Sequence, residues 1–340
     1  LGEWCKLYKK KDYWQSLDFK TKDYHWNDRD KLYKDYLYLE QLYEKVIISC
    51  SDSLNQFHKV NYSTRYWKIL IGPWLFHFIQ ILFDRWQMVK SLEGDSINGT
   101  IVLSGLNNSM VPINMMEFIK LYSGDLWNHW IFGEIIKYTG KIPITKVPYI
   151  HNDEQNISSL KPNKIKQLVK KFIKKYSFKT QKNKYFFYGS SFSKTKQMTL
   201  ELSLKQIPSF YDFSENENEE DDNFEKNRSL FDVDFYEVDE FESFLSKFIP
   251  SQMPKYYLEG FNDLNSQCKK RYWPTNPKCI ITSSAIINSD IFKFWVAEKT
   301  EQGSKLVISQ HGGHYGIGKW SAGENHEISI QGTVEGDIEC

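Results

Sequence analysis

The stretch KCIITSSAIINSDIFKFWVAEKTEQGSKLVIS, residues 278–309, decides the fold. Its apolar and β-branched residues predict one strand over 278–282 and a second over 305–309. Between the strands a helix is expected over 291–301, after a serine–aspartate pair that can cap it. A strand, a helix and a strand within roughly 35 residues form a βαβ unit, in which the two strands are parallel. The sequence therefore predicts an α/β fold.

A glycine-rich segment, QHGGHYG, follows the second strand directly at residues 310–316. Ligands of open α/β sheets bind at the carboxyl ends of the strands, and glycine lets backbone N–H groups approach a phosphate. His311 can donate a hydrogen bond to a phosphate or act as an acid/base group, or it can be a packed histidine in a tight turn. The predicted donor- and phosphate-binding residues are its neighbours Gln310, Gly312, Gly313, His314, Tyr315 and Gly316.

The sequence predicts neither a metal site nor a bound cofactor. His311, His314 and His326 offer at best a His-x-x-His pattern in a loop, which is a poor metal signature. The segment 310–316 matches neither the Walker pattern nor GxGxxG, so ATP- and NAD-type sites lack a motif. The five cysteines form no CxxC pair and are too dispersed for a disulfide framework, which predicts an intracellular, reduced protein.

Length, charge and aromatic content favour some classes of protein and exclude others. The chain has 340 residues, enough for about two domains. Its net charge is +1, with 44 basic and 43 acidic side chains, so no overall field favours nucleic acid or anionic lipid as a partner. Aromatic residues make up 16% of the chain, and rings at that density fill cores or line sugar- and base-binding clefts.

Two long helices are predicted in the first part of the chain. Apolar and aromatic residues at helical spacing indicate a helix from Asp28, which can cap it, to about His58. Ser63 can cap a second helix that continues through residues 69–86, with a kink near Pro73.

A third helix is expected over 114–138, where Gly140 is a suitable stop. Short β-rich runs over 100–103 and 142–150 lie on either side of it. The first part is therefore predicted to be a helix-rich α/β domain.

Three segments of the sequence are relevant to whether the protein spans a membrane, is targeted to one or binds its surface. The most apolar stretch, 69–83, has about 15 residues where a spanning helix needs about 20, so a buried core helix is expected. The N-terminus has no apolar signal core, and its start without Met predicts that the chain begins inside a longer reading frame. The basic amphipathic segment 161–175 can bind anionic lipid or another polyanion, or it can be an ordinary surface helix.

Near the N-terminus, carboxylate, imidazole and indole side chains occur close together in sequence. If residues 1–2 end a strand, Glu3 faces the interdomain cleft and can serve as general base toward an acceptor hydroxyl; otherwise it is a surface or capping carboxylate. Arg65 can pair with a phosphate, or with Asp28 or Asp84. The acceptor-side candidates are Trp4, His25, Asp28, Arg29 and Arg65.

Several blocks of sequence resemble a known family. The blocks are LGEWC (1–5), YHWNDRDKLYKDYLYLEQLYE (24–44), RYWKILIGPWL (65–75) with FDRW (83–86), and QHGGHYG (310–316). They are similar to the LIC12162-type transferase family, whose members come from loci for O-antigen and other bacterial surface polysaccharides. The resemblance extends from residue 1 to about residue 327.

The resemblance implies a transferase of the two-domain GT-B architecture, similar to capsule-type glycosyl- and glycerophosphotransferases. Two Rossmann-like domains are implied, with the donor nucleotide held mainly by the second. We expect a helix-rich acceptor-side domain over 1–270, with an acidic insertion near 214–226, and the start of the donor-binding domain over 271–340. Family members continue with further α/β sequence, so the second domain is expected to be truncated in this chain.

The leading hypothesis is a metal-independent glycosyltransferase. The backbone amides of Gly312 and Gly313, with His311, would stabilise the leaving nucleotide phosphate, and Glu3 would be the general base.

The expected partners are a nucleotide-sugar donor, as substrate and not as cofactor, and a glycan or lipid-linked glycan acceptor. Two alternatives stay open: transfer of glycerol phosphate or another phosphate-linked unit, and a non-catalytic carbohydrate-binding scaffold. The expected location is the cytoplasm, with peripheral association at the inner face of the cytoplasmic membrane as an option.

Overall fold

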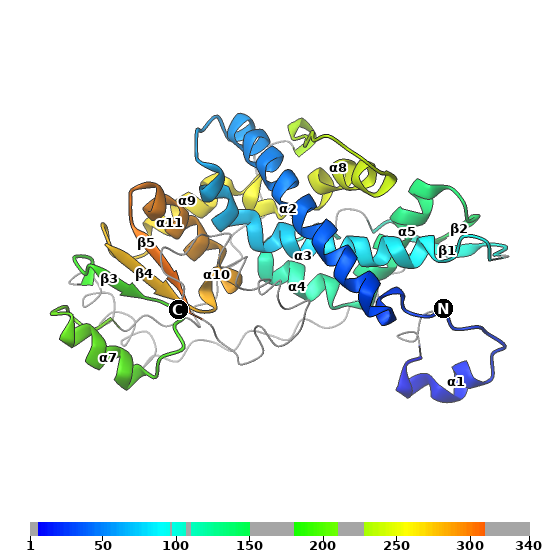
Figure 1. Cartoon of the computed structure of the whole chain (residues 1–340), viewed down its shortest axis with the longest axis horizontal. Coiled ribbons are helices and arrows are strands. Elements are labelled where there is room, and N and C mark those ends of the chain that lie inside the picture. The colour runs from blue at the N-terminus through cyan, green and yellow to red at the C-terminus, as the bar shows by residue number, and fades with distance from the viewer. Residues whose placement is uncertain (1–5, 96, 107–109, 150–179, 210–227, 310–340) are drawn as a thin grey trace.

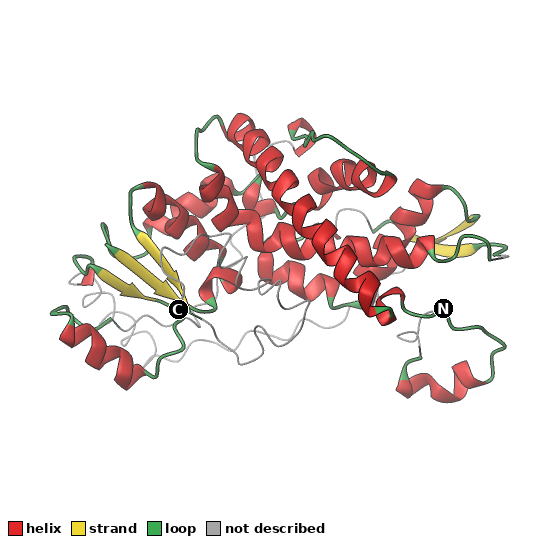
Figure 2. Ribbon diagram, in the orientation of Figure 1, coloured by secondary structure: helices red, strands yellow, loops and turns green. Residues whose placement is uncertain are grey.

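The structure, a computed structural model, describes residues 6–95, 97–106, 110–149, 180–209 and 228–309. Within these ranges the chain is a helix-rich α/β protein with two small parallel sheets (Figure 1, Figure 2). The sheets lie toward opposite ends of the long axis in Figure 1, and long helices occupy the space between them.

The helices and strands follow one another along the chain with these bounds: η2 (Tyr8–Lys10), α1 (Lys11–Gln15), η3 (His25–Asn27), α2 (Arg29–His58), α3 (Thr64–Lys90), β1 (Thr100–Ser104), α4 (Met115–Tyr122), α5 (Asp125–Thr139), β2 (Ile144–Pro148), β3 (Tyr185–Phe187), α7 (Lys194–Ser203), η5 (Arg228–Leu230), α8 (Glu240–Gln252), η6 (Lys255–Tyr257), α9 (Phe261–Lys269), β4 (Cys279–Thr282), α10 (Ala285–Asn288), α11 (Asp290–Glu301) and β5 (Lys305–Ile308).

The two long helices begin where the sequence predicts. The Asp28 side chain accepts hydrogen bonds from the backbone N–H groups of Asp30 and Lys31, and so caps α2. The Ser63 side chain caps α3 in the same way by accepting from the N–H of Tyr66. Both capping predictions are confirmed.

Helix α3 is the centre of the fold, because α2, α5, α8, α10 and α11 all contact it. It runs unbroken through Pro73, and most residues of the apolar stretch 69–83 are buried, which confirms the predicted core helix. Among the described helices, α3 is the one long and apolar enough to cross a membrane, and 78% of its most apolar window is buried inside the protein.

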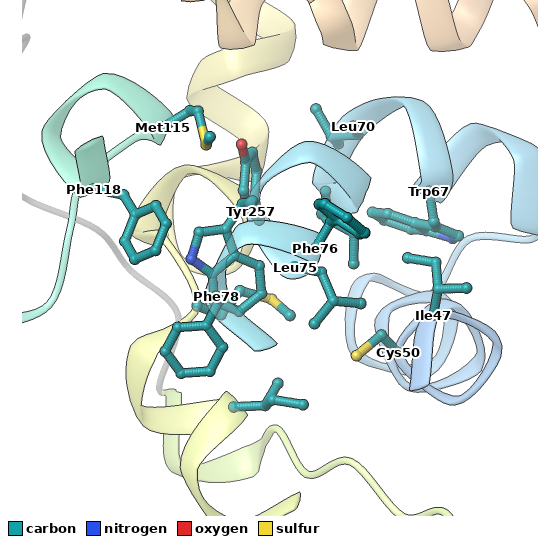
Figure 3. Close-up of a cluster of buried hydrophobic side chains, with 14 of the residues drawn as sticks. Ile47, Cys50, Trp67, Leu70, Leu75, Phe76, Phe78, Met115, Phe118 and Tyr257 are labelled. Carbon is teal, nitrogen blue, oxygen red and sulfur yellow. The ribbon is translucent and has the colours of Figure 1, made fainter. Parts of the chain in front are cut away.

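Aromatic side chains fill much of the core around α3. Figure 3 shows part of this cluster, in which side chains of α2, α3, α4 and η6 pack together. Trp67, Trp74 and Trp127 are fully buried. A Cβ atom at Gly72 would lie 2.7 Å from the hydroxyl oxygen of Tyr43, so glycine at this position lets α2 and α3 approach closely.

The prediction of one helix over 114–138 was wrong, because the chain forms two helices there, α4 and α5. The Asn128 side chain explains the break: its Nδ2 atom donates to the carbonyl oxygens of Tyr122, at 2.7 Å, and Gly124, at 2.8 Å. Carbonyl groups at a helix end need such partners. Gly140 ends α5 in the left-handed conformation, as predicted.

The first sheet pairs β1 with β2 in parallel, and the second has the order β3-β4-β5, again parallel. The predicted βαβ unit of β4, α11 and β5 is confirmed. Strand β3 was not predicted, and it pairs with β4 from a position 94 residues earlier, Tyr185 against Cys279. The domain division at residue 270 stays a prediction.

A histidine on α5 gives the fold a testable pH dependence. His129 Nε2 accepts a hydrogen bond from the backbone N–H of Leu103, at 3.1 Å, so this nitrogen must be unprotonated in the folded protein. Burial lowers the pKa of His129 below its usual value. The unfolded chain therefore takes up a proton near pH 6.5 while the folded chain does not, and stability is expected to fall as the pH drops from about 7 to about 5.

Urea unfolding of wild type and His129→Gln at several pH values measures this effect. The variant keeps an acceptor for Leu103 but loses the titrating group, so its stability should depend less on pH over the same window. Equal pH dependence in the two proteins would contradict the prediction.

Candidate functional site

The carboxyl ends of β3, β4 and β5 meet at one edge of the second sheet, because the three strands are parallel (Figure 1). Serine residues follow each strand at this edge. Ser190 and Ser191 come after β3, Ser283 and Ser284 after β4, and Ser309 after β5. We call these five residues the serine edge.

Hydroxyl groups of the serine edge form a hydrogen-bonded chain. Ser283 Oγ lies 2.6 Å from Ser191 Oγ and 2.6 Å from Ser309 Oγ. Ser283 is buried, Ser309 is half-buried and Ser191 is exposed, so the chain leads from the sheet to the surface. Each hydroxyl can donate or accept, and a chain of hydroxyls can therefore reverse its direction. The outermost hydroxyl can thus either donate a hydrogen bond to an anionic ligand or accept one from a cationic or neutral group.

Backbone hydrogen bonds hold the three loops of the serine edge in place. The carbonyl oxygen of Gly189 accepts from the N–H groups of Ser283, at 3.0 Å, and Ser284, at 3.2 Å. Gly189 has a φ of 58°, in the left-handed region that glycine adopts most readily. Ser309 N–H donates to the carbonyl of Thr282 at 2.8 Å. The edge is therefore organised before any ligand arrives.

The start of α7 adds positive potential beside the serine edge. Ser193 caps this helix, and Lys194 and Lys196 lie in its first turn. The Ser190 hydroxyl donates to Gln197 Oε1 at 2.9 Å, which holds the loop after β3 against α7. Helix N-termini and lysine side chains both favour anions. The arrangement suits a phosphate-bearing ligand.

The sequence-predicted donor segment begins directly after this edge. Gln310, His311, Gly312, Gly313, His314, Tyr315 and Gly316 follow Ser309 in the chain and lie outside the described residues, as do Glu3, Trp4, His326 and the segments 161–175 and 214–226. The serine edge itself was missed by sequence reasoning. Its signal was available as a Ser-Ser pair after the strand 279–282 and a serine at the end of the next strand.

A second polar cluster lies where the segment before α2 meets α3. His25 Nε2 lies 2.9 Å from Asp84 Oδ1, and both side chains are more than nine-tenths buried. Arg85 pairs with the other oxygen of Asp84 and holds Asn128 Oδ1 through two nitrogens, at 2.9 and 3.1 Å. Two sequence blocks that are far apart in the chain, 24–44 and 83–86, meet here.

The electrostatics of this cluster keep Asp84 ionised. Burial alone would raise the pKa of Asp84, but hydrogen bonds from His25 and Tyr24 and the charge of Arg85 outweigh it, so the net shift is downward. Burial and the negative charge of Asp84 raise the pKa of Tyr24, which remains a hydrogen-bond donor. An ionised Asp84 can only accept at this contact, so His25 Nε2 donates the hydrogen bond to Asp84 Oδ1. The second ring nitrogen of His25 is Nδ1. That Nδ1 atom is buried and has no hydrogen-bond partner in the described part of the chain.

The structure brings together only some of the acceptor-side candidates. His25, Asp28 and Arg29 lie together at the start of α2. Arg65 lies in the first turn of α3, and Asp84 is 19 residues further along the same helix, about 28 Å away. Arg65 therefore pairs neither with Asp84 nor with Asp28, which is at the opposite end of the α2–α3 pair.

A fully buried charged cluster fixes the start of α11, just beyond the serine edge. Asp290 Oδ1 lies 2.7 Å from Lys293 Nζ and accepts a hydrogen bond from the Tyr257 hydroxyl. The Lys293 ammonium also donates to the Tyr257 hydroxyl oxygen at 2.7 Å. Asp290 Oδ2 accepts from the backbone N–H of Met115 at 2.8 Å, which connects α11 to α4. This cluster holds the connection after β4 against the rest of the molecule.

A ligand pocket at the first sheet and a metal site have less support than the serine edge. A cavity of about 190 Å³ is lined by Val89, Leu92, Glu93, Gly94, Asp95, Ile97, Thr139, Lys141 and Ile142. It lies at the amino ends of β1 and β2, the edge where α/β sheets do not usually bind ligands. In the described ranges, no group of three His, Cys, Asp or Glu side chains is placed to hold a metal ion.

Comparison with known proteins gives one match. A family model described as LIC12162 family transferase matches residues 1–333. No curated protein and no solved structure matches the chain.

Proposed function

This chain belongs to the LIC12162 family of transferases, and from that membership we propose that it is a glycosyltransferase that transfers a sugar from a nucleotide-sugar donor to a growing bacterial surface polysaccharide of the O-antigen type. The proposal includes two Rossmann-like domains in the GT-B arrangement, with the donor held by the one that contains β4 and β5.

The observation that carries the proposal is the serine edge. It is a preorganised row of hydroxyls at the carboxyl ends of three parallel strands, beside a helix N-terminus with two lysines. Such an edge supports binding of a phosphate-bearing donor. The glycine-rich segment 310–316 follows it directly in the sequence.

In the proposed reaction, the acceptor hydroxyl attacks the anomeric carbon of the sugar and the nucleotide phosphate leaves. His311 and the backbone amides of Gly312 and Gly313 stabilise the negative charge that develops on the leaving phosphate. Gln310, His314, Tyr315 and Gly316 complete the donor site. His311 follows Ser309 of the serine edge by two residues in the sequence.

Glu3 is the proposed general base, which takes the proton of the acceptor hydroxyl. Trp4, His25, Asp28 and Arg29 are proposed to line the acceptor side. Arg65 stays a candidate for pairing with a phosphate. The alternative, in which it pairs with Asp28 or Asp84, is excluded because the length of α3 separates Arg65 from both.

A donor panel tests the proposal. The full chain is incubated with UDP-, GDP-, dTDP- and CMP-linked sugars, with and without a lipid-linked glycan extract, and the released nucleotide is identified. We expect nucleotide release that depends on one donor and increases with the acceptor. Release of a nucleoside diphosphate would point to a neutral-sugar donor. Release of a monophosphate would point to a Kdo-like sugar carried by CMP or to a glycerophosphate donor.

Thermal shift with the same compounds separates an enzyme from a scaffold. A ligand at about 100 times its dissociation constant stabilises a protein by roughly 2.7 kcal/mol, which is readily measured. Stabilisation by glycans without stabilisation by any nucleotide would contradict the proposal and favour a carbohydrate-binding scaffold.

Ser283→Ala is expected to weaken donor binding about two- to twelvefold. The variant breaks the hydroxyl chain in its middle, and one neutral hydrogen bond contributes about 0.5–1.5 kcal/mol. Isothermal titration with the donor found in the panel measures the change. Ser304→Ala is the matched control, since Ser304 is a buried serine at the opposite edge of the same sheet, where its hydroxyl donates to the Pro277 carbonyl. Equal losses in the two variants would exclude a specific role for the serine edge.

A further inference from the structure

Residues 6–20 form a small unit of their own at the N-terminal end of the described chain, which we call the basic arm. It contains η2 and α1, and Figure 1 shows α1 apart from the helices of the body. The arm is held together from inside. Trp14 Nε1 donates to the Leu7 carbonyl at 3.0 Å, the Trp14 and Phe19 rings meet edge to face at 6.3 Å, and Lys6 Nζ lies 5.7 Å from the centre of the Phe19 ring.

The outer surface of the basic arm is rich in large apolar side chains. Tyr8 is 85% exposed and Tyr13 is 68% exposed, and Leu7 and Leu17 are each more than two-fifths exposed. Single exposed apolar side chains are common, but four within eleven residues form a patch that is typical of an interaction surface.

The same arm is strongly basic, although the whole chain is nearly neutral. It carries five lysines, Lys6, Lys9, Lys10, Lys11 and Lys20, against two aspartates, Asp12 and Asp18. Lys9, Lys10 and Lys11 are consecutive and exposed, and they lie between the exposed Tyr8 and Tyr13. The arm thus combines positive charge with aromatic and aliphatic groups on one short segment.

We propose that the basic arm docks the protein on an anionic lipid bilayer. Lysines near a bilayer are attracted to anionic headgroups, and tyrosine side chains favour the boundary between headgroups and acyl chains. Leu7 and Leu17 gain from burial in the acyl region, whereas a nucleic acid would offer them no comparable environment. The combination of charge and aliphatic exposure therefore selects a lipid surface over a nucleic acid.

The segment that follows the arm connects it to the body of the protein near the acceptor side. Lys22 pairs with Asp95 at 2.8 Å, which anchors the chain just after the arm to the turn that follows α3. His25 is eight positions after Leu17, so at most about 28 Å of chain joins the two residues. Docking would thus bring the acceptor side close to the membrane, which suits a lipid-linked acceptor. This last step rests on the proposed function; the docking itself does not.

Sedimentation with vesicles tests the docking on the full chain. Wild type should pellet with vesicles of phosphatidylcholine and phosphatidylglycerol, and much less with phosphatidylcholine alone. The triple variant Lys9→Gln, Lys10→Gln and Lys11→Gln should bind the anionic vesicles about a hundredfold more weakly. The double variant Tyr8→Ser and Tyr13→Ser should also bind them more weakly.

A matched triple variant controls for net charge. Lys120→Gln, Lys146→Gln and Lys278→Gln remove the same charge from exposed lysines outside the arm and should leave vesicle binding unchanged. Equal losses in the two triple variants, or wild-type binding that does not depend on phosphatidylglycerol, would overturn the proposal. Nucleotide release measured without vesicles should be the same in all these proteins. A failure of the docking is therefore distinguishable from a failure of the proposed function.

Discussion

Replacing Asp290 by alanine is expected to lower the free energy of unfolding by about 3–5 kcal/mol, a large part of the stability of an ordinary protein. Asp290 and Lys293 are both fully buried, and Lys293 has no exposed surface at all. Without the carboxylate, the ammonium group stays buried, with the Tyr257 hydroxyl as its one remaining hydrogen-bond partner in the described part of the chain, and the N–H of Met115 loses its acceptor. An uncompensated buried charge is among the most destabilising changes in a folded protein.

Chemical denaturation of a double-mutant cycle checks this prediction. Asp290→Asn combined with Lys293→Met removes both charges and keeps an acceptor for Met115, so the double variant should be more stable than the sum of the two single changes implies. Strictly additive effects, or an alanine variant as stable as wild type, would contradict the stated role of the cluster.

His311→Ala is expected to lower kcat by on the order of a hundred- to a thousandfold. In the proposed mechanism His311 donates to the leaving phosphate, and removing one preorganised donor to developing charge costs about 3–4 kcal/mol in the transition state. The stability of the variant should stay near that of wild type, because the loss belongs to the reaction and not to the fold.

Steady-state kinetics with the donor identified by the panel measures the effect, and thermal unfolding confirms that the variant is folded. His151→Ala serves as the matched control, since no role is assigned to this histidine. Unchanged turnover in His311→Ala would remove this residue from the mechanism.

Local patterns in the sequence predicted the local parts of the fold. The caps at Asp28 and Ser63 and the βαβ unit of β4, α11 and β5 each depend on residues that are close together in the chain. The separation of α4 from α5 was missed because it depends on where one side chain, that of Asn128, directs its amide. Helical periodicity continues across the break and does not reveal it.

The candidate site was harder to predict, because its residues come from segments that are far apart in the sequence and lie together only in the folded protein. Strand β3 has three residues, too few for a pattern, and its partner lies far along the chain. Ser191 and Ser309 are ordinary loop residues until the sheet places both beside Ser283. The pairing of His25 with Asp84 likewise joins residues 59 positions apart.

The register of β3 against β4 also has a consequence for how this protein is made. The ribosome releases Tyr185 long before its partner Cys279, and at 5–20 residues per second the interval is about 5–20 s. Helices form in about a microsecond, so α2 and α3 can pack before β4, the partner of β3, has been synthesised. During this interval β3 has no neighbour at the edge that pairs with β4, and an unpaired strand edge is a site of aggregation that a chaperone can cover.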